Sequence, residues 1–152
     1  MFLSDIVNVG KLTQNITPEQ LVEILKRHVN HMTGIIEQYS GALLQCVGDA
    51  VLAFWHPKHS SPSHAQLAFD ASREVFATLP DLFASQKHLT YDVDIVLGTG
   101  AMAGALFGPA KRFQVMGKAM AIGHRLSKAR DVRGSSIRMS QYTRDLIDPQ
   151  DA

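Results

Sequence analysis

A long apolar run, from Leu43 to Phe54, is broken near its middle by Gly48-Asp49. A Gly-Asp pair between two hydrophobic stretches is typical of the tight turn of a β-hairpin, because such turns need backbone angles that glycine adopts easily. Two short antiparallel strands are therefore predicted on either side of the pair. The rest of the chain has to cover the apolar side chains that these strands present.

Two helices are predicted from matching start signals. Thr17-Pro18-Glu19-Gln20 puts a capping threonine before a proline at the first helical position, with a glutamine three residues after the cap. This helix is expected to end at Ser40-Gly41, and its apolar residues recur at helical spacing: Leu21, Leu25, Val29, Met32 and Ile36. Ser63 and Gln66 repeat the capping pattern, and the second helix is expected to end before Pro80.

The other segments complete an alternating order of strands and helices. Strands are predicted at 2–7, 93–97, 101–107, 112–116 and 137–140, and helices at 119–129 and 141–147. The order is strand, helix, strand, strand, helix, strand, strand, helix, strand, followed by the short terminal helix. This order predicts an α+β sandwich with helices on one face of the sheet, related to the ferredoxin-like split βαβ plan.

Composition and charge argue against some classes of partner. The 152 residues fit one domain, and a formal net charge of +1 gives no basis for binding nucleic acid. The longest apolar stretch, 93–108, contains Asp94 and several glycines and is too short to span a bilayer, so no membrane contact is expected. The lone Cys46 is expected to be a small core residue in a reducing, cytoplasmic location. A strand that starts at residue 2 suggests a segment taken from a longer chain.

Asp5 and Asp49 are the candidate functional residues, because each ends a strand-like run. Carboxylate oxygens suit Mg²⁺ or Mn²⁺, and two ions about 3.5–4 Å apart can stabilise the attacking and leaving oxygens of a displacement at phosphorus. An aspartate at a strand end and a Gly-Asp turn are also common without any function. The residues by themselves leave both interpretations open.

Other polar residues carry weaker signals. Loop cations at Lys11, Lys111 and Arg112 could neutralise phosphate, but such residues are usually solvated. The histidines of the 56–64 loop, which are His56, His59 and His64, lack the ligand pattern of zinc sites and are expected to face solvent. His28 and His31 lie three apart and are expected on the polar edge of the first long helix.

Several motifs then occur in one order along the chain. They are Phe2-Leu3-Ser4-Asp5-Ile6-Val7, Thr17-Pro18-Glu19-Gln20-Leu21, Gly48-Asp49-Ala50-Val51-Leu52-Ala53-Phe54, the glycines around Gly98-Thr99-Gly100, and Val115-Met116-Gly117 leading to Arg125-Leu126. Together they resemble the class III nucleotidyl cyclase domain, the catalytic module of adenylyl and guanylyl cyclases, from about residue 2 to about residue 147. By the same resemblance, the family's final strands are missing.

The resemblance implies a site shared between two protomers. Asp5 and Asp49 match the family's metal ligands, the backbone carbonyl of Ile6 matches a third ligand, and two Mg²⁺ or Mn²⁺ ions are implied. Arg125 matches the arginine that acts on the transition state. The partner is expected to be a second copy of this chain or a complementary cyclase domain.

Four positions depart from the family's pattern. Gln45 and Gln114 stand where adenylyl cyclases carry their purine-reading residues, and a neutral amide discriminates less sharply than a fixed cation. Ala121 replaces the asparagine that contacts the transition state. Asn8-Val9-Gly10 replaces the glycine-containing phosphate loop, although its backbone N–H groups could still face phosphates.

The sequence therefore supports two functions. The first is the metal-bearing half of a two-domain adenylyl cyclase, which makes cyclic AMP and pyrophosphate and favours ATP over GTP. The second is a catalytically degenerate module that keeps the fold for dimerisation or regulation in signalling. The paired acids favour the first, and Ala121 favours the second.

Overall fold

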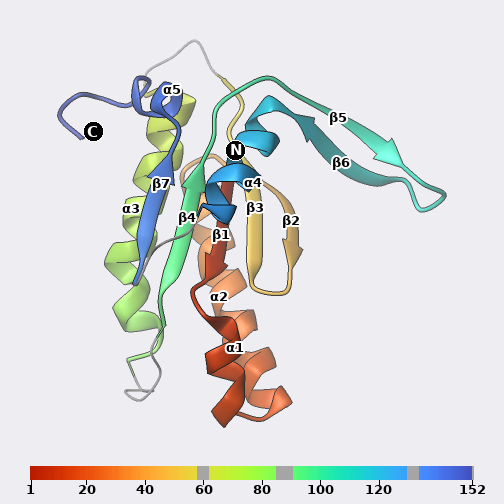
Figure 1. The fold of residues 1–152 in the computed structure, drawn as a ribbon, viewed down its shortest axis with the longest axis vertical. Helices are drawn as coiled ribbons and strands as arrows, with labels where there is room; N and C mark the ends of the chain where they lie inside the picture. The colour runs from red at the N-terminus through yellow and green to blue at the C-terminus, as the bar shows by residue number, and fades with distance from the viewer. Residues whose placement is uncertain (58–61, 85–90, 130–133, 152) are drawn as a thin grey trace.

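Strand β1 (Phe2–Ile6) lies in the middle of a five-stranded sheet in this computed structural model, which describes residues 1–57, 62–84, 91–129 and 134–151 (Figure 1). The strand order is β2-β3-β1-β4-β7, and only the β4–β7 pair is parallel. The other strands of this sheet are β2 (Ala42–Val47), β3 (Ala50–Phe54), β4 (Val93–Leu97) and β7 (Ser136–Met139). The predicted hairpin across Gly48-Asp49 is confirmed as β2 and β3.

A second, two-stranded sheet extends away from the first (Figure 1). It consists of β5 (Met102–Phe107) and β6 (Arg112–Gly117), paired in antiparallel fashion. Gly104 on β5 lets the ring of Phe113 on β6 pack against the backbone, because a Cβ at position 104 would lie 2.4 Å from that ring. This close packing accounts for one of the glycines that punctuate the segment.

Three long helices pack on the five-stranded sheet. They are α2 (Pro18–Gln38), α3 (His64–Leu82) and α4 (Lys118–Lys128), and the shorter segments are α1 (Val9–Leu12), the 3₁₀ turn η1 (Thr13–Asn15) and α5 (Gln141–Arg144). The capping box is confirmed, since Thr17 Oγ1 accepts from the Gln20 N–H and Gln20 Oε1 accepts from the Thr17 N–H. Ser63 caps α3 by accepting from the Gln66 N–H at 3.0 Å.

Two helix ends differ from the sequence prediction. Helix α3 continues through Pro80 to Leu82 instead of ending before the proline. A proline close to a helix end removes one backbone hydrogen bond, and burial of Leu79 and Phe83 on either side holds the last turn in place. The terminal helix stops at Arg144, and 3₁₀-type hydrogen bonds from the N–H groups of Leu146 and Ile147 continue it as a turn.

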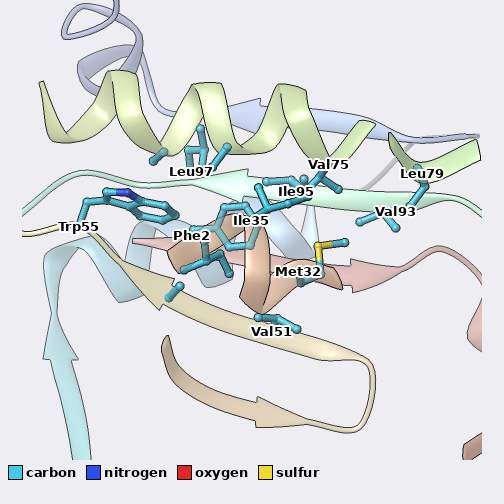
Figure 2. Close-up of a cluster of buried hydrophobic side chains, with 14 residues drawn as sticks. Phe2, Met32, Ile35, Val51, Trp55, Val75, Leu79, Val93, Ile95 and Leu97 are labelled. Carbon is cyan, nitrogen blue, oxygen red and sulfur yellow. The ribbon is translucent and has the colours of Figure 1, made fainter. Parts of the chain in front are cut away.

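The main core lies between the sheet and helices α2 and α3 (Figure 2). Alternate residues of β4, namely Val93, Ile95 and Leu97, point into it beside Phe2 of β1. Helix α2 contributes Met32 and Ile36, and both are fully buried. These two helices therefore share one face of the sheet, as expected.

Helix α4 lies on the opposite face, which differs from the expected arrangement. The side chain of Asp94 alternates with the core-facing residues of β4, and Arg138 of β7 joins it to α4 by donating to the Leu126 carbonyl. Gly98 lies so close to this helix that an added Cβ would be 2.9 Å from the Ala119 carbonyl. The order of elements does not specify this face, because it does not say which strands pair or in which direction, and the parallel β4–β7 pair appears only in the structure.

Cys46 is exposed, so its assignment to the core is wrong. It lies on β2, which is the edge strand of the sheet, and Leu43 and Val47 on the same strand are also exposed. In the apolar run 43–54, the side chains of β3 are therefore buried or half-buried, whereas most side chains of β2 are exposed. Large apolar side chains are exposed on the second sheet as well, at Leu106, Phe107, Phe113 and Met116.

One ion pair is buried on the α4 face. Arg138 Nε donates to Asp94 Oδ1 at 3.1 Å, Arg138 Nη2 pairs with Asp94 Oδ2, and Ser136 Oγ donates to Asp94 Oδ1 at 2.6 Å. The Asp94 side chain is only 2% exposed, so its charge depends on these partners. The pair ties β4, β7 and α4 together.

We expect Arg138→Met to lower the free energy of unfolding by about 3–5 kcal/mol, because it leaves the Asp94 carboxylate buried without its cation. Arg27→Met is the control, since Arg27 pairs with Glu23 on the exposed surface of α2, and its loss should cost about 0.5 kcal/mol or less. Urea unfolding measures both. The double variant Asp94→Leu/Arg138→Met should recover most of the loss, and equal effects of the Arg27 and Arg138 variants would contradict the role of this pair.

Candidate functional site

The two predicted acids lie at the same end of the sheet, Asp5 near the end of β1 and Asp49 in the β2–β3 turn. Gly48 has a φ of 61°, which allows the two-residue turn that brings Val47 and Ala50 into register. Asp49 follows in this turn, and its Oδ2 accepts a hydrogen bond of 2.9 Å from the N–H of Ile6. Ile6 directly follows Asp5, so the Asp49 carboxylate is fixed against the backbone beside the first acid.

Asp5 is half-buried and lies on the face of the sheet that α4 partly covers. Its register partner across the antiparallel β1–β4 pair is Asp94, so the two residues share a face. Arg138 compensates the charge of Asp94. The surroundings of Asp5 therefore contain an arginine as well as a second carboxylate, which reduces like-charge repulsion at this point.

The available donors fit a magnesium or manganese ion held together with a nucleotide. Among the described residues, no three His, Cys, Asp or Glu side chains gather into a metal cluster. Two carboxylates and the carbonyl of Ile6 are hard oxygen donors, and Mg²⁺ is commonly bound by one or two carboxylates plus substrate phosphates and water.

His28, a residue of α2, supports the Asp49 turn. The sequence did not predict this role. Instead of lying on a polar edge, His28 is fully buried in α2, and its Nε2 lies 3.0 Å from the Asp49 carbonyl oxygen. A carbonyl only accepts, so Nε2 carries the proton and donates. The hydroxyl of Tyr91 hydrogen-bonds to Nδ1 on the other side of the ring. Position 28 falls between apolar positions of the helical stripe, which was the available signal for its burial.

The environment keeps His28 neutral and Tyr91 protonated. Burial lowers the pKa of His28 to about 4, although the Asp49 carbonyl and carboxylate act in the opposite direction. Burial raises the pKa of Tyr91, and the negative charge of Asp49 adds to this shift. A neutral imidazole that donates from Nε2 accepts at Nδ1, so the Tyr91 hydroxyl donates to His28.

The predicted phosphate loop begins one residue after β1, with Val7 between Ile6 and Asn8. Asn8 is exposed with a φ of 58°, Val9 begins the short helix α1, and Gly10 is exposed. Val9 and Ile6 pack in a second small core with Ile24 and Phe83. The segment 8–10 therefore lies one residue after the acid-bearing strand, on a buried support.

The remaining predicted residues come from other elements. Gln45 is on β2 and Gln114 is on β6, both are exposed, and these two strands contact each other. Arg125 and Ala121 are exposed on α4. The loop cations Lys11, Lys111 and Arg112 are exposed, as is His56, while His64 is half-buried and His59 lies outside the described residues.

A hollow of about 530 Å³ opens elsewhere on the molecule. Its lining includes Met1, Trp55, His64, Thr99 and Phe113, and none of the predicted site residues is part of it. Met1 precedes β1, whereas Asp5 and Ile6 lie at the far end of the same strand. The hollow is thus separate from the acidic site.

The sequence model of the family described as "Adenylate and Guanylate cyclase catalytic domain" matches residues 1–151. No curated protein sequence matches. Within the described residues, no helix is both long and apolar enough to cross a membrane.

Solved structures share the fold at low sequence identity. The adenylyl cyclase CyaB from P. aeruginosa is 24% identical, with a TM-score of 0.83 over 95% of this chain and 77% of that one. The guanylyl cyclase Cya2 is 20% identical, with a TM-score of 0.80 over 97% and 76%. A non-canonical dimeric guanylyl cyclase domain of the RhoGC fusion protein from Blastocladiella emersonii is 17% identical, with a TM-score of 0.78 over 95% and 79%. The chain belongs to the adenylate and guanylate cyclase catalytic domain family.

Proposed function

We propose that this domain converts ATP to cyclic AMP and pyrophosphate, and that it supplies the metal-binding half of a site formed with a second cyclase domain. The observation that carries the proposal is the hydrogen bond between the Asp49 carboxylate and the Ile6 N–H, which holds the second acid against the backbone of the residue that follows Asp5. A reaction at phosphorus with a highly charged substrate relies mainly on positioning and electrostatics, which such a site can supply.

Each residue has a role in this proposal. Asp5, Asp49 and the Ile6 carbonyl hold two Mg²⁺ or Mn²⁺ ions, which when bound neutralise the triphosphate and assist attack of the ribose 3′ oxygen on the α-phosphorus. The N–H groups of Asn8, Val9 and Gly10 receive the phosphates of the nucleotide. Arg125 steadies negative charge at the site on the partner.

Several features support a two-protomer arrangement. Gln114 on β6 and Arg125 on α4 come from elements other than those that carry the acids, whereas Gln45 lies on the β2 strand of the Asp49 hairpin, and all three side chains are exposed. Exposed apolar side chains on β2, β5 and β6 offer a surface that a second copy or a complementary cyclase domain could cover. The base-contacting glutamines of one protomer would then face the metal ligands of the other.

The preference for ATP over GTP belongs to the proposal and does not follow from the fold. The solved structures with this fold include both adenylyl and guanylyl cyclases. One of them is a rhodopsin-guanylyl cyclase with converted specificity in complex with ATPalphaS. The candidates for contact with the purine are Gln45 and Gln114, and both are neutral amides that can donate and accept.

The alternative function is a catalytically degenerate module used for dimerisation or regulation. Ala121 favours it, because a methyl group cannot donate a hydrogen bond to the transition state. The hydrogen bond from Ile6 to Asp49 also gives that carboxylate a structural role that needs no ion. Metal-dependent ATP binding without turnover, under every pairing tried, would select this alternative.

Complementation tests the proposed function directly. The chain is assayed with Mn²⁺ and either ATP or GTP, alone and after titration with a cyclase domain that carries the lysine and asparagine absent here. We expect cyclic AMP formation to rise with the added domain and to saturate near a 1:1 ratio, because one protomer then supplies the groups that the other lacks. No gain with any complementary domain would contradict the proposal.

The acids are tested by neutral variants of the same shape. Asp5→Asn and Asp49→Asn should each abolish Mn²⁺-dependent binding of an ATP analogue in calorimetry, because an amide is a much weaker metal ligand than a carboxylate. The amide oxygen introduced by Asp49→Asn can still accept from the Ile6 N–H, so the turn should survive. Asp81→Asn, at an exposed position near the end of α3, is the control. Unchanged binding in the Asp5 and Asp49 variants would remove them from the site.

Position 121 is tested by restoring the missing group. Ala121→Asn should raise turnover of the isolated chain by about 100-fold, which is the usual effect of one preorganised donor. Ala121 is exposed, so the larger side chain costs no buried space. Ala84→Asn, at an exposed position beyond α3, should leave turnover unchanged. A folded Ala121→Asn variant without any gain would show that this position does not limit the reaction.

A further inference from the structure

Asp49 is held by two hydrogen bonds, one to its side chain and one to its backbone. Its side-chain Oδ2 accepts from the Ile6 N–H of β1 at 2.9 Å, and its carbonyl oxygen accepts from His28 Nε2 of α2 at 3.0 Å. The first bond fixes the position of the Asp49 carboxylate. The second fixes the orientation of the peptide group between Asp49 and Ala50. Two bonds from different elements leave the residue little freedom to rotate, even though it lies in a tight turn.

Tyr91 fixes the orientation of the imidazole. Its hydroxyl donates to His28 Nδ1, so a flip of the ring would turn a carbon toward the Asp49 carbonyl and break both bonds. The ring of Tyr91 is itself packed against Phe83, with 4.4 Å between ring centroids. The contacts thus run from the Phe83–Tyr91 pair, through His28, to the carbonyl group of Asp49.

Packing alone does not account for a histidine at this position. The other buried residues of α2 are all apolar: Ile24, Met32, Ile35 and Ile36. An aliphatic side chain at position 28 would fill the same space without the cost of burying two ring nitrogens. What an aliphatic residue cannot do is hydrogen-bond to the Asp49 carbonyl.

We propose that His28 and Tyr91 are positioning residues that hold the Asp49 turn in the geometry a divalent ion requires. Neither residue touches the ion or the nucleotide, and both act through the backbone of Asp49. The part of this inference that concerns the ion rests on the proposed function, whereas the part that concerns the turn does not. Partners of metal ligands commonly change metal affinity by about 10- to 100-fold when removed.

The experiment compares four variants. His28→Leu removes both hydrogen bonds of the ring, Tyr91→Phe removes only the hydroxyl, and His28→Gln restores a donor near Nε2. His31→Leu is the matched control, because His31 lies on the same helix and bonds through Nε2 to Thr78 of α3 at 2.9 Å, away from the turn. Each variant is measured by amide hydrogen exchange of residues 49–51, by urea unfolding and by titration with Mn²⁺ in the presence of a non-cyclisable ATP analogue.

We expect exchange at residues 49–51 to be about 10-fold faster in His28→Leu and Tyr91→Phe, because the turn opens without global unfolding. Mn²⁺ affinity should fall by about 10-fold or more in His28→Leu, by less in Tyr91→Phe, and should largely recover in His28→Gln. His31→Leu should lower stability without either effect. A rise in exchange together with this order of affinities supports the inference.

The contrary outcomes are distinct. Unchanged exchange in both His28→Leu and Tyr91→Phe would overturn the positioning role, as would an equal change in His31→Leu. Faster exchange with unaltered Mn²⁺ affinity would overturn its link to the ion. A wild-type chain that binds no Mn²⁺ would refute the proposed function, and the exchange measurements would still decide whether His28 and Tyr91 hold the turn.

Discussion

The hydrogen bond from the Ile6 N–H to the Asp49 carboxylate is the contact on which the candidate site depends. It joins residues 43 positions apart, at the end of β1 and in the β2–β3 turn. The two acids lie on separate elements, and the pairing of β1 with β3 runs only from Phe2–Ala53 to Ser4–Val51, so this bond extends the link between the strands to the turn itself. With it, the Asp49 carboxylate lies against the backbone of the strand that carries Asp5, which is the placement that the proposed function relies on.

The two faces of the sheet contribute differently to this arrangement. Helices α2 and α3 cover one face with the main core, and the small core around Ile6, Ile24 and Phe83 extends this support to the end of β1 (Figures 1 and 2). On the other face, Arg138 pairs with Asp94 of β4 and donates to the Leu126 carbonyl of α4. This holds α4 against β4, the strand whose Asp94 is the register partner of Asp5. Buried contacts therefore fix the acid-bearing strand, while the residues that would meet a nucleotide base lie on exposed strands.

Some features proved difficult to predict, and each has a physical reason. Pro80 looked like a helix end, but burial of the residues around it outweighs one lost hydrogen bond. Cys46 looked like a core residue because it lies in an apolar run, yet β2 is an edge strand on which most side chains stay exposed. His28 looked like a polar surface residue, whereas its partners are a carbonyl and a hydroxyl that come from distant parts of the sequence.

The sequence by itself determined the local structure, because capping groups, turn residues and apolar periodicity act over a few neighbouring positions. It also led to the prediction that Asp5 and Asp49 are metal ligands, since carboxylates at strand ends and the spaced motifs around them are visible in the chain. Only the tertiary structure decided which side of the sheet receives α4, which apolar residues stay exposed, and that His28 and Tyr91 support the Asp49 turn. Those outcomes depend on contacts between residues far apart in the chain, and no local pattern encodes their geometry.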